Sequence, residues 1–346
     1  MPPFDDYTWS EIQSQPQAWA ATLDLLHGRA AAVRAFYQNQ PFDQVVFTGC
    51  GSTYYLSLAA AASLREIGRV NAVGQPASEI WLYPRTTFPT DQRTLLVAVS
   101  RSGATTETLR AVESFRAAGR GPVLTLSCYA EQPLAQLGDL NLVIEAGQEQ
   151  SIAQTRAFST LYLATLYLAA LQADRADLLG ELGRLPAAGR QALDTYQPLA
   201  HVLAANERLE RCFFLGSGAR YGLAAELSLK MKEMSLGESE PFHFLEYRHG
   251  PQSMANPGTL IVGLLSGTNH ARESAVLGEM RAHGARCVAI GAQSADVELV
   301  AADELVRGPL YLPFGQMLAY ERAVWRGLTP DRPHQLSAVV KLGDAT

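Results

Sequence analysis

The chain has 346 residues, of which 47% are hydrophobic and 18% are charged. This length and apolar content suit one large domain or two ordinary ones and exclude an intrinsically disordered chain. Its 28 basic and 34 acidic residues give a net charge of −6, and no segment concentrates Lys and Arg, so no nucleic-acid surface is expected. The N-terminus lacks signal-peptide features, and the longest apolar run is too short to span a membrane. We expect a cytoplasmic protein.

Helical patterns and short apolar strands alternate along the chain. The expected elements are, in order, a helical arm over 7–40, a strand over 45–47, a helix over 54–66, a strand over 95–99, a helix over 105–118 and a strand over 122–126. Gly-rich or Ser-rich turns follow the first two strands. This alternation predicts an α/β fold in which helices flank a parallel sheet.

Three features of the first half recur about 166 residues later. The motif Phe-x-Gly-x-Gly-x-x-Tyr stands at 47–54 and again at 214–221. A strand that ends in serine, and an Arg-Ala-x-Gly segment before a further strand, recur in the same order. These offsets indicate two copies of one α/β unit, although any two such sheets can share glycine-rich first turns. The predicted division is an arm at 1–40, units at 41–175 and 205–330, a helical linker at 176–204 and a tail at 331–346.

The loop after the second strand has the composition of a phosphate-binding site. Ser100, Ser102 and Thr105 surround Gly103, and a helix is expected to begin there. Backbone N–H groups and the positive end of a helix dipole favour a dianion at such a point, and Arg101 would add positive charge. The glycine spacing fits neither a dinucleotide motif nor a P-loop. A small phosphate ester is therefore expected, although Ser and Thr could serve only as helix caps.

The second copy contains a helix with charged side chains in a mostly apolar sequence. Glu226, Lys230 and Glu233 are spaced four and three residues apart, so they share one face. A carboxylate beside an ammonium group in a closed crevice can transfer protons; the alternative is an exposed salt bridge. His249 precedes Gly-Pro, which places it on a turn, where it could be a proton donor or a surface residue.

Five motifs occur in an order that resembles the sugar isomerase (SIS) domain family. They are Gly-Cys-Gly-Ser-Thr at 49–53, Ser-Arg-Ser-Gly-Ala-Thr at 100–105, Ala-Gln-Thr-Arg-Ala-Phe-Ser-Thr at 153–160, Leu-Lys-Met-Lys-Glu at 229–233 and Arg-His-Gly-Pro at 248–251. The resemblance covers about residues 45–341. It is closest to the isomerase half of glutamine–fructose-6-phosphate aminotransferase and to AgaS-type aminosugar-phosphate deaminase/isomerases. It implies two flavodoxin-like SIS subdomains, each a parallel sheet flanked by helices.

The resemblance also assigns roles to individual residues. It implies phosphate binding by Thr53, Ser100, Arg101, Ser102 and Thr105, and sugar binding by Gly51, Ser52, Ile152 and Ala153. It implies that Glu233 moves a proton between two sugar carbons, beside Lys230. His249 would open the sugar ring and would come from the neighbouring subunit, which implies a homodimer. No cofactor or metal is implied.

This sequence departs from the family pattern at three points. Arg101 replaces the family's usual glutamine and adds charge. Ala338 stands where the family often has an imine-forming lysine, and Lys341 is three residues too late, so covalent imine formation is not expected. Only about 40 residues precede the first unit, so glutamine is not the expected ammonia source.

The expected activity is that of an aminosugar-6-phosphate deaminase/aldose–ketose isomerase. Its substrate would be a hexose or aminohexose 6-phosphate, converted to a ketose phosphate with release of ammonia when the sugar carries nitrogen. The alternatives are a fructosamine-6-phosphate deglycase, a plain phosphosugar isomerase and a non-catalytic phosphosugar sensor.

Overall fold

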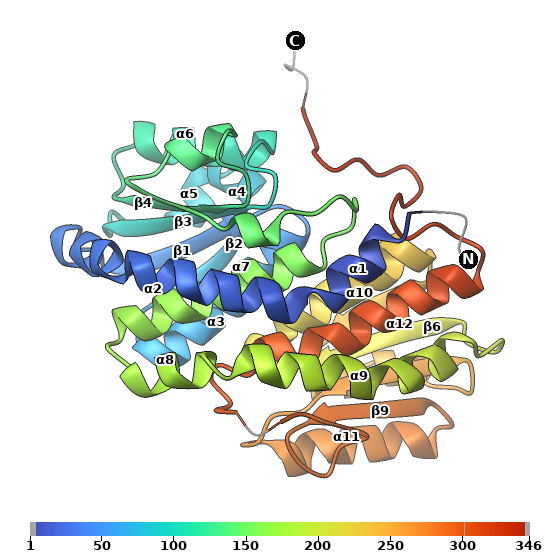
Figure 1. Ribbon diagram of the computed structural model, residues 1–346. Coiled ribbons are helices and arrows are strands. Elements are labelled where there is room, and N and C mark those ends of the chain that lie inside the picture. Colours follow the sequence, from blue (N-terminus) through green and yellow to red (C-terminus); the bar gives the residue numbers. More distant parts are fainter. Residues whose placement is uncertain (1–4, 301, 343–346) are drawn as a thin grey trace. The chain divides into compact units, whose positions relative to one another are not determined.

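The structure is a computed structural model that describes residues 5–300 and 302–342 (Figure 1). It divides into two compact units, each assembled from separate stretches of chain. The N-terminal unit contains the described parts of Gln17–Glu149, Arg156–Gly183 and Ser337–Thr346; the C-terminal unit contains those of Met1–Pro16, Gln150–Thr155 and Arg184–Leu336.

The N-terminal unit is built on a parallel sheet with the strand order β2-β1-β3-β4-β5. The strands are β1 (Gln44–Gly49), β2 (Ala72–Pro76), β3 (Thr94–Ser100), β4 (Val123–Ser127) and β5 (Leu140–Val143). Every residue of the central strand β3 is buried, as expected for a parallel sheet covered on both faces. The sheet therefore provides a rigid edge from which the loops project.

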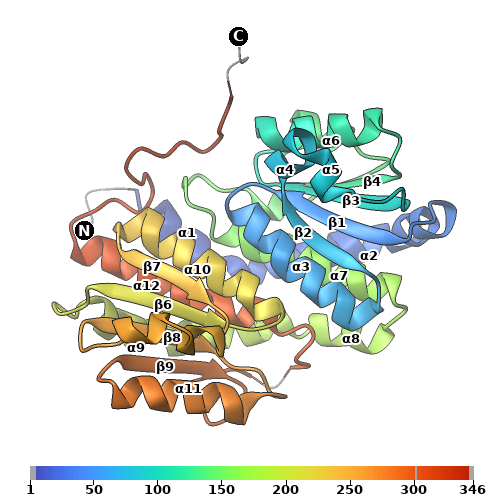
Figure 2. The same ribbon diagram turned by 180° about the vertical axis from the view of Figure 1, so that it is seen from behind.

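Helices cover both faces of this sheet (Figures 1 and 2). They are α2 (Gln15–Asn39), α3 (Ser52–Gly68), α4 (Ala77–Leu82), α5 (Pro84–Thr87), α6 (Thr106–Ala117), α7 (Arg156–Gln172) and α8 (Ala176–Leu182), with short 3₁₀ turns η1 (Pro133–Gln136) and η2 (Glu145–Gly147). One core cluster joins Val46 and Leu96 of the sheet to Val112 and Phe115 of α6. This packing fixes the position at which α6 begins.

The C-terminal unit has a second parallel sheet with the order β10-β9-β8-β6-β7. Its strands are β6 (Arg211–Gly216), β7 (Glu238–Phe242), β8 (Thr259–Leu264), β9 (Arg286–Gly291) and β10 (Val297–Glu298). Numbered within its own unit, each sheet has the flavodoxin-like order 2-1-3-4-5. The predicted α/β class with two parallel sheets flanked by helices is confirmed.

The helices of the C-terminal unit come from both ends of the chain. They are α1 (Tyr7–Gln13), α9 (Leu185–Ala204), α10 (Ala219–Ser235), α11 (His270–Ala282) and α12 (Leu312–Trp325), with 3₁₀ turns η3 (Glu246–Arg248), η4 (Pro251–Met254) and η5 (Gly308–Tyr311). Figure 2 shows α10 and α11 on opposite faces of this sheet. None of the helices within residues 5–300 and 302–342 has the length and apolarity needed to cross a membrane.

The arm expected as a single helical region over 7–40 is interrupted at Ser14, between α1 and α2. Pro16, in the first turn of α2, explains the break. A proline ring clashes with the carbonyl four residues earlier and donates no N–H, so α1 cannot continue through it. The predicted arm, the 176–204 linker and the 331–346 tail are each divided between the two units, and the domain boundaries stay a prediction.

Candidate functional site

Three hydroxyl groups converge in the loop between β3 and α6. The Oγ of Ser100 lies 3.4 Å from the Oγ of Ser102 and 3.3 Å from the Oγ1 of Thr105, and the latter two oxygens are 3.3 Å apart. We call Ser100, Ser102 and Thr105 the hydroxyl cluster. The sequence predicted these residues as phosphate ligands, and the structure brings all three together.

Backbone geometry holds the hydroxyl cluster at the start of α6. The N–H of Gly103 donates to Ser100 Oγ and the N–H of Ala104 donates to Ser102 Oγ, each at 3.2 Å. Gly103 has a φ of 65°, a left-handed conformation that favours glycine. Because α6 begins at Thr106, the positive end of its dipole faces the cluster. The arrangement suits a small anion.

Arg101, between the two serines, is buried and interacts with other groups of the chain. Its Nη1 lies 3.2 Å from Glu149 Oε2, and its Nη2 donates to the carbonyl of Ala338 at 3.2 Å. The fully buried Glu149 also accepts the N–H of Ala157 at the start of α7, at 3.0 Å. The predicted contact of Arg101 with phosphate stays a prediction; in the structure its guanidinium connects the loop to a carboxylate and to the tail.

The first glycine-rich turn lies at the same edge of the sheet, since β1 and β3 are paired neighbours. Thr53 Oγ1 donates to the carbonyl of Cys50 and accepts the N–H of Cys50, both at 2.9 Å. Its hydroxyl therefore closes the turn, and the structure does not bring it into the hydroxyl cluster. Gly51 has a φ of 55°, and Ser52 is buried at the start of α3. Burial raises the pKa of the Cys50 thiol to about 11, so this residue is not a nucleophile near neutral pH.

A cavity of about 310 Å³ opens beside the hydroxyl cluster. It is lined by Arg101, Ser102, Ala104, Tyr129, Glu131, Gln132, Glu149, Ala338, Val339 and Lys341. The tail reaches this cavity because the N–H of Thr106 donates to the carbonyl of Val340 at 3.5 Å and the N–H of Leu342 donates to Thr106 Oγ1 at 3.2 Å. Sequence reasoning missed Tyr129 and Gln132; their position just after β4, at the carboxyl end of a parallel strand, was the available signal.

In the C-terminal unit, α10 contains a buried group of three charges. Lys230 and Glu226 are fully buried, and Glu233 is 19% exposed. Lys230 Nζ lies 3.3 Å from Glu226 Oε1 and contacts Glu233 Oε2. Burial alone would lower the pKa of Lys230, but the two carboxylates outweigh it and the pKa is raised. The alternative of an exposed salt bridge is therefore wrong, because α10 is packed on several sides.

His249 lies on an exposed turn that neighbouring residues fix in place. Arg248 donates two hydrogen bonds to Glu279 on α11, at 2.7 and 2.6 Å, and Tyr247 is buried against Phe213 and Phe242. Within the described part of the chain, the imidazole of His249 has no hydrogen-bond or ion-pair partner. It is available for contact with a substrate or a second subunit.

Two buried acidic residues, Glu11 and Asp331, hold the segment that contains Ile152 and Ala153. Glu11 accepts the N–H of Gln150 at 2.6 Å and also contacts the Ser151 hydroxyl. Asp331, in turn, caps α1 by accepting the N–H of Thr8 at 2.8 Å, and its carbonyl accepts the N–H of Ile152 at 3.0 Å.

The predicted residues therefore belong to two units. Gly51, Ser52, Thr53, Arg101 and the hydroxyl cluster are in the N-terminal unit, whereas Ile152, Ala153, Lys230, Glu233 and His249 are in the C-terminal unit.

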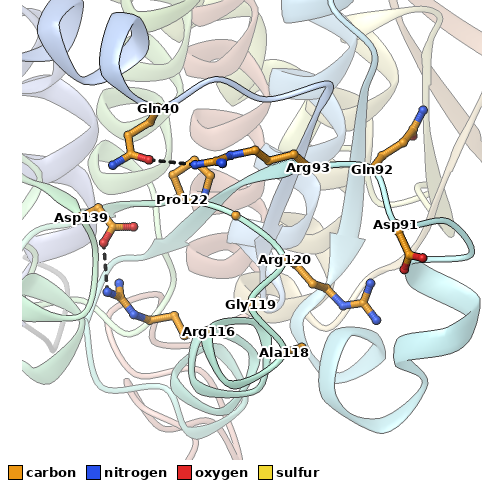
Figure 3. Close-up of a pocket in the computed structure, with 11 residues that line it drawn as sticks. Gln40, Asp91, Gln92, Arg93, Arg116, Ala118, Gly119, Arg120, Pro122 and Asp139 are labelled. Atoms are coloured by element: carbon orange, nitrogen blue, oxygen red, sulfur yellow. Dashed lines mark hydrogen bonds and ion pairs between the residues drawn. The ribbon is translucent and has the colours of Figure 1, made fainter.

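A larger cavity of about 650 Å³ lies at the amino ends of β3 and β4 (Figure 3). Three arginines line it, but they do not converge on one point. Arg116 pairs with Asp139 at 2.9 Å, Arg93 donates to Gln40 at 3.2 Å, and Arg120 points away from both. We assign no role to this cavity. Among the described residues, no group of three or more His, Cys, Asp or Glu side chains could hold a metal ion.

The SIS domain family matches residues 40–171 and 207–302. A glutamine–fructose-6-phosphate aminotransferase of Leifsonia xyli is 31% identical over 367 residues, covering 95% of this chain and 58% of the relative. The corresponding Pyrobaculum aerophilum protein is 28% identical over 360 residues, covering 97% of this chain and 58% of the relative. This chain thus spans 58% of the length of these two relatives.

Solved structures resemble the chain over nearly its whole length. Glucosamine-6-phosphate deaminase from Thermotoga maritima has a TM-score of 0.83 and 26% identity, covering 97% of this chain and 100% of that one. Tagatose-6-phosphate ketose/aldose isomerase from Escherichia coli has a TM-score of 0.86 at 21% identity, covering 96% of both chains. The second likeness concerns the fold alone.

Proposed function

The chain belongs to the SIS domain family, and from that premise we propose that it is an aminosugar-6-phosphate deaminase and aldose–ketose isomerase. The observation that carries this proposal is the hydroxyl cluster, whose three oxygens lie 3.3 to 3.4 Å apart at the start of α6. The full-length likeness to a glucosamine-6-phosphate deaminase supports the choice of an aminosugar. The product would be a ketose 6-phosphate together with ammonia.

The substrate phosphate is held by the hydroxyl cluster. Its oxygens accept hydrogen bonds from the three hydroxyls and gain from the dipole of α6. This binding takes place at the sugar's C6 end, away from the reacting carbons. Binding energy from a remote group can hold the open-chain sugar in position for proton transfer.

Glu233 is the proposed base. Its carboxylate removes the proton from C2 of the open-chain aminosugar, which gives an enolamine, and returns it to C1, which gives a ketimine. Water then adds at C2, and the carbon–nitrogen bond breaks to release ammonia and leave the ketose. Lys230 contacts Glu233 Oε2, so its ammonium group holds the carboxylate in position for proton transfer.

His249 is the proposed group for ring opening, where a proton moves between the ring oxygen and the anomeric hydroxyl. Its exposure suits a residue supplied to a second copy of the chain. Leu245 and Met254 on the same segment are 46% and 37% exposed. Exposed apolar side chains beside an exposed histidine support a homodimer as part of the proposal. We further propose that the protein acts in the cytoplasm.

Three related activities use the same groups. A fructosamine-6-phosphate deglycase would act on a substrate whose nitrogen bears a second substituent, and a plain isomerase would act on a sugar without nitrogen. A phosphosugar sensor would bind the phosphate without turnover; Ala338, at the position of the family's tail lysine, favours this candidate. The reaction products distinguish the proposed deaminase from these three candidates, because the deaminase alone forms both ammonia and a ketose from glucosamine 6-phosphate.

The test is ammonia and ketose release from glucosamine 6-phosphate and its stereoisomers. Glu233→Gln should reduce kcat by a factor on the order of 10² to 10⁴, with a far smaller change in KM. Glu240→Gln is a matched control, because Glu240 is exposed and pairs only with the exposed Lys232 among the described residues. Equal rates for Glu233→Gln and the wild type would overturn the proposed base. Phosphosugar binding without turnover of any substrate would establish the sensor instead.

A further inference from the structure

The C-terminal sheet has its own loop at the position where the N-terminal sheet carries the hydroxyl cluster. In both units the loop follows the third strand, β3 or β8, and leads into a helix, α6 or α11. The C-terminal loop reads Ser266-Gly267-Thr268-Asn269. Its hydroxyls and backbone N–H groups are of the kind that binds anions at a helix start.

A carboxylate of the protein occupies this loop. Glu304 Oε1 accepts the N–H of Gly267 at 3.1 Å, and Glu304 Oε2 lies 3.3 Å from the hydroxyl of Thr268. Arg220 donates to Glu304 Oε1 at 3.0 Å. A Cβ atom at Gly267 would stand 2.9 Å from Glu304 Oε2. The absence of a side chain at this position therefore allows the carboxylate to approach the backbone.

A second carboxylate satisfies the rest of the loop. The buried Glu273 accepts the N–H of Ser266 at 2.6 Å, and the hydroxyl of Ser266 accepts the N–H of Asn269 at 2.9 Å. The polar groups that would bind a phosphate from outside are thus already bonded within the chain.

Positive charge collects around Glu304. Arg220 and Arg307 both lie near the hydroxyl of Tyr311; burial raises the pKa of this hydroxyl, and the two guanidinium charges oppose the rise. Arg307 is 7% exposed, and its Nη1 has no hydrogen-bond partner within the described part of the chain. Two arginines, a hydroxyl and a backbone N–H beside one carboxylate match the donor set of a phosphate site.

We propose that Glu304 is a built-in anion that occupies the phosphate-type loop of the C-terminal sheet and excludes phosphate esters from it. A carboxylate and a phosphate accept hydrogen bonds from the same donors, so only one of them can hold the loop. Of these two loops, only the one in the N-terminal unit is then open to phosphate in the wild-type chain. Removal of the Glu304 carboxylate should open the second loop to inorganic phosphate.

The experiment measures thermal unfolding with and without inorganic phosphate. Glu304→Ala should lower Tm in phosphate-free buffer, because Arg220 and the loop lose their partner. Phosphate should then raise Tm by more than it raises that of the wild type or of Glu298→Gln, an exposed control on β10. Adding Arg220→Gln to Glu304→Ala should abolish this additional rise. The proposal is overturned if phosphate shifts Glu304→Ala no more than the wild type.

Calorimetric titration with phosphate gives a second measurement, on Glu304→Ser, a shorter polar side chain that also removes the carboxylate and is used if Glu304→Ala does not fold. This variant should bind one more phosphate per chain than the wild type, and an unchanged stoichiometry would also overturn the proposal. The test does not depend on the proposed function. If the hydroxyl cluster does not bind phosphate, the wild type binds fewer phosphates per chain than expected. If Glu304 does not exclude phosphate, the wild type and the Glu304 variant bind the same number per chain.

Discussion

The two loops after β3 and β8 stand at the same position in sheets of the same strand order, yet their side chains leave them in different states. In the N-terminal unit, the hydroxyls of Ser100, Ser102 and Thr105 contact one another, and no carboxylate among the described residues contacts them. In the C-terminal unit, Glu273 and Glu304 accept hydrogen bonds from the loop. Topology therefore determines where an anion can bind, and neighbouring side chains determine whether it does.

The position of Glu149 explains why no carboxylate in the described part of the chain occupies the loop between β3 and α6. Glu149 lies close to the N-terminal loop but is directed to Arg101 and to the start of α7. The guanidinium between the serines thus holds the carboxylate away from the hydroxyls. The corresponding residue of the C-terminal loop is Gly267, which follows Ser266 as Arg101 follows Ser100. Because Gly267 has no side chain, Glu304 can approach the backbone there.

The largest expected effect concerns the buried charges of the C-terminal unit. Lys230→Met should lower the free energy of unfolding by about 3 to 5 kcal/mol, because it removes the ammonium group that lies 3.3 Å from the fully buried carboxylate of Glu226. Urea denaturation measures the loss. Lys232→Met is the control, since this exposed pair with Glu240 should contribute at most about 1 kcal/mol. Adding Glu226→Leu to Lys230→Met should recover part of the loss; similar stabilities for the two single variants would contradict the buried arrangement.

The second prediction compares the two loops directly. The double variant Ser100→Ala with Ser102→Ala should raise KM for a hexose 6-phosphate by at least about 100-fold, since each hydrogen bond to a charged group contributes about 1.5 to 3 kcal/mol. Ser266→Ala, in the occupied loop, should leave KM unchanged. Steady-state kinetics gives both values. A comparable rise in KM for Ser266→Ala would refute the difference between the loops.

The third prediction concerns the attachment of the tail to the open loop. Arg101→Lys keeps the charge but cannot reach Glu149 and the Ala338 carbonyl with one planar group. Loss of one such hydrogen bond from a charged group, about 1.5 kcal/mol, should accelerate amide exchange at Leu342 by roughly tenfold. Hydrogen exchange measures this rate, and Arg85→Lys, on the exposed surface, serves as the control. Unchanged exchange at Leu342 would show that Arg101 does not hold the tail.

The smallest effect is expected at the turn that carries His249. Hydrogen bonds from Arg248 lower the pKa of Glu279 below its ordinary value of 4.5. A lowered pKa means that the pair supports the turn above pH 4.5 and loses this support as the pH falls through the folded-state pKa. Glu279→Gln should therefore change the NMR signals of the His249 turn at pH 7 and resemble the wild type in strong acid. A difference that persisted in acid would assign the effect to packing.

Local patterns in the sequence predicted most of the sheets and the groups within single elements. The apolar runs at 45–47, 95–99 and 122–126 fall within β1, β3 and β4, apart from Pro122 just before β4. The four- and three-residue spacing on α10 placed Lys230 between two carboxylates, as the structure has it. The spacing could not show that this group is buried, because burial depends on what packs against α10.

The contacts missed from the sequence join residues far apart in the chain. Asp331 caps α1 across 323 residues, and Arg101 reaches Ala338 across 237. No local signal marks such pairs, because neither side chain differs from an ordinary surface residue until the fold brings the two together. Glu304 is a similar case, since its partners Gly267 and Arg220 are 37 and 84 residues away.

The cap that Asp331 provides also affects how the protein forms on the ribosome. The residues around Tyr7 and Thr8 are made 324 and 323 residues before the carboxylate that accepts their N–H groups. Helix α1 and the segment around Ile152 therefore cannot reach their final state until Asp331 has left the ribosome. A nascent chain stalled before residue 331 should expose this region to proteases, and release of the full chain should protect it.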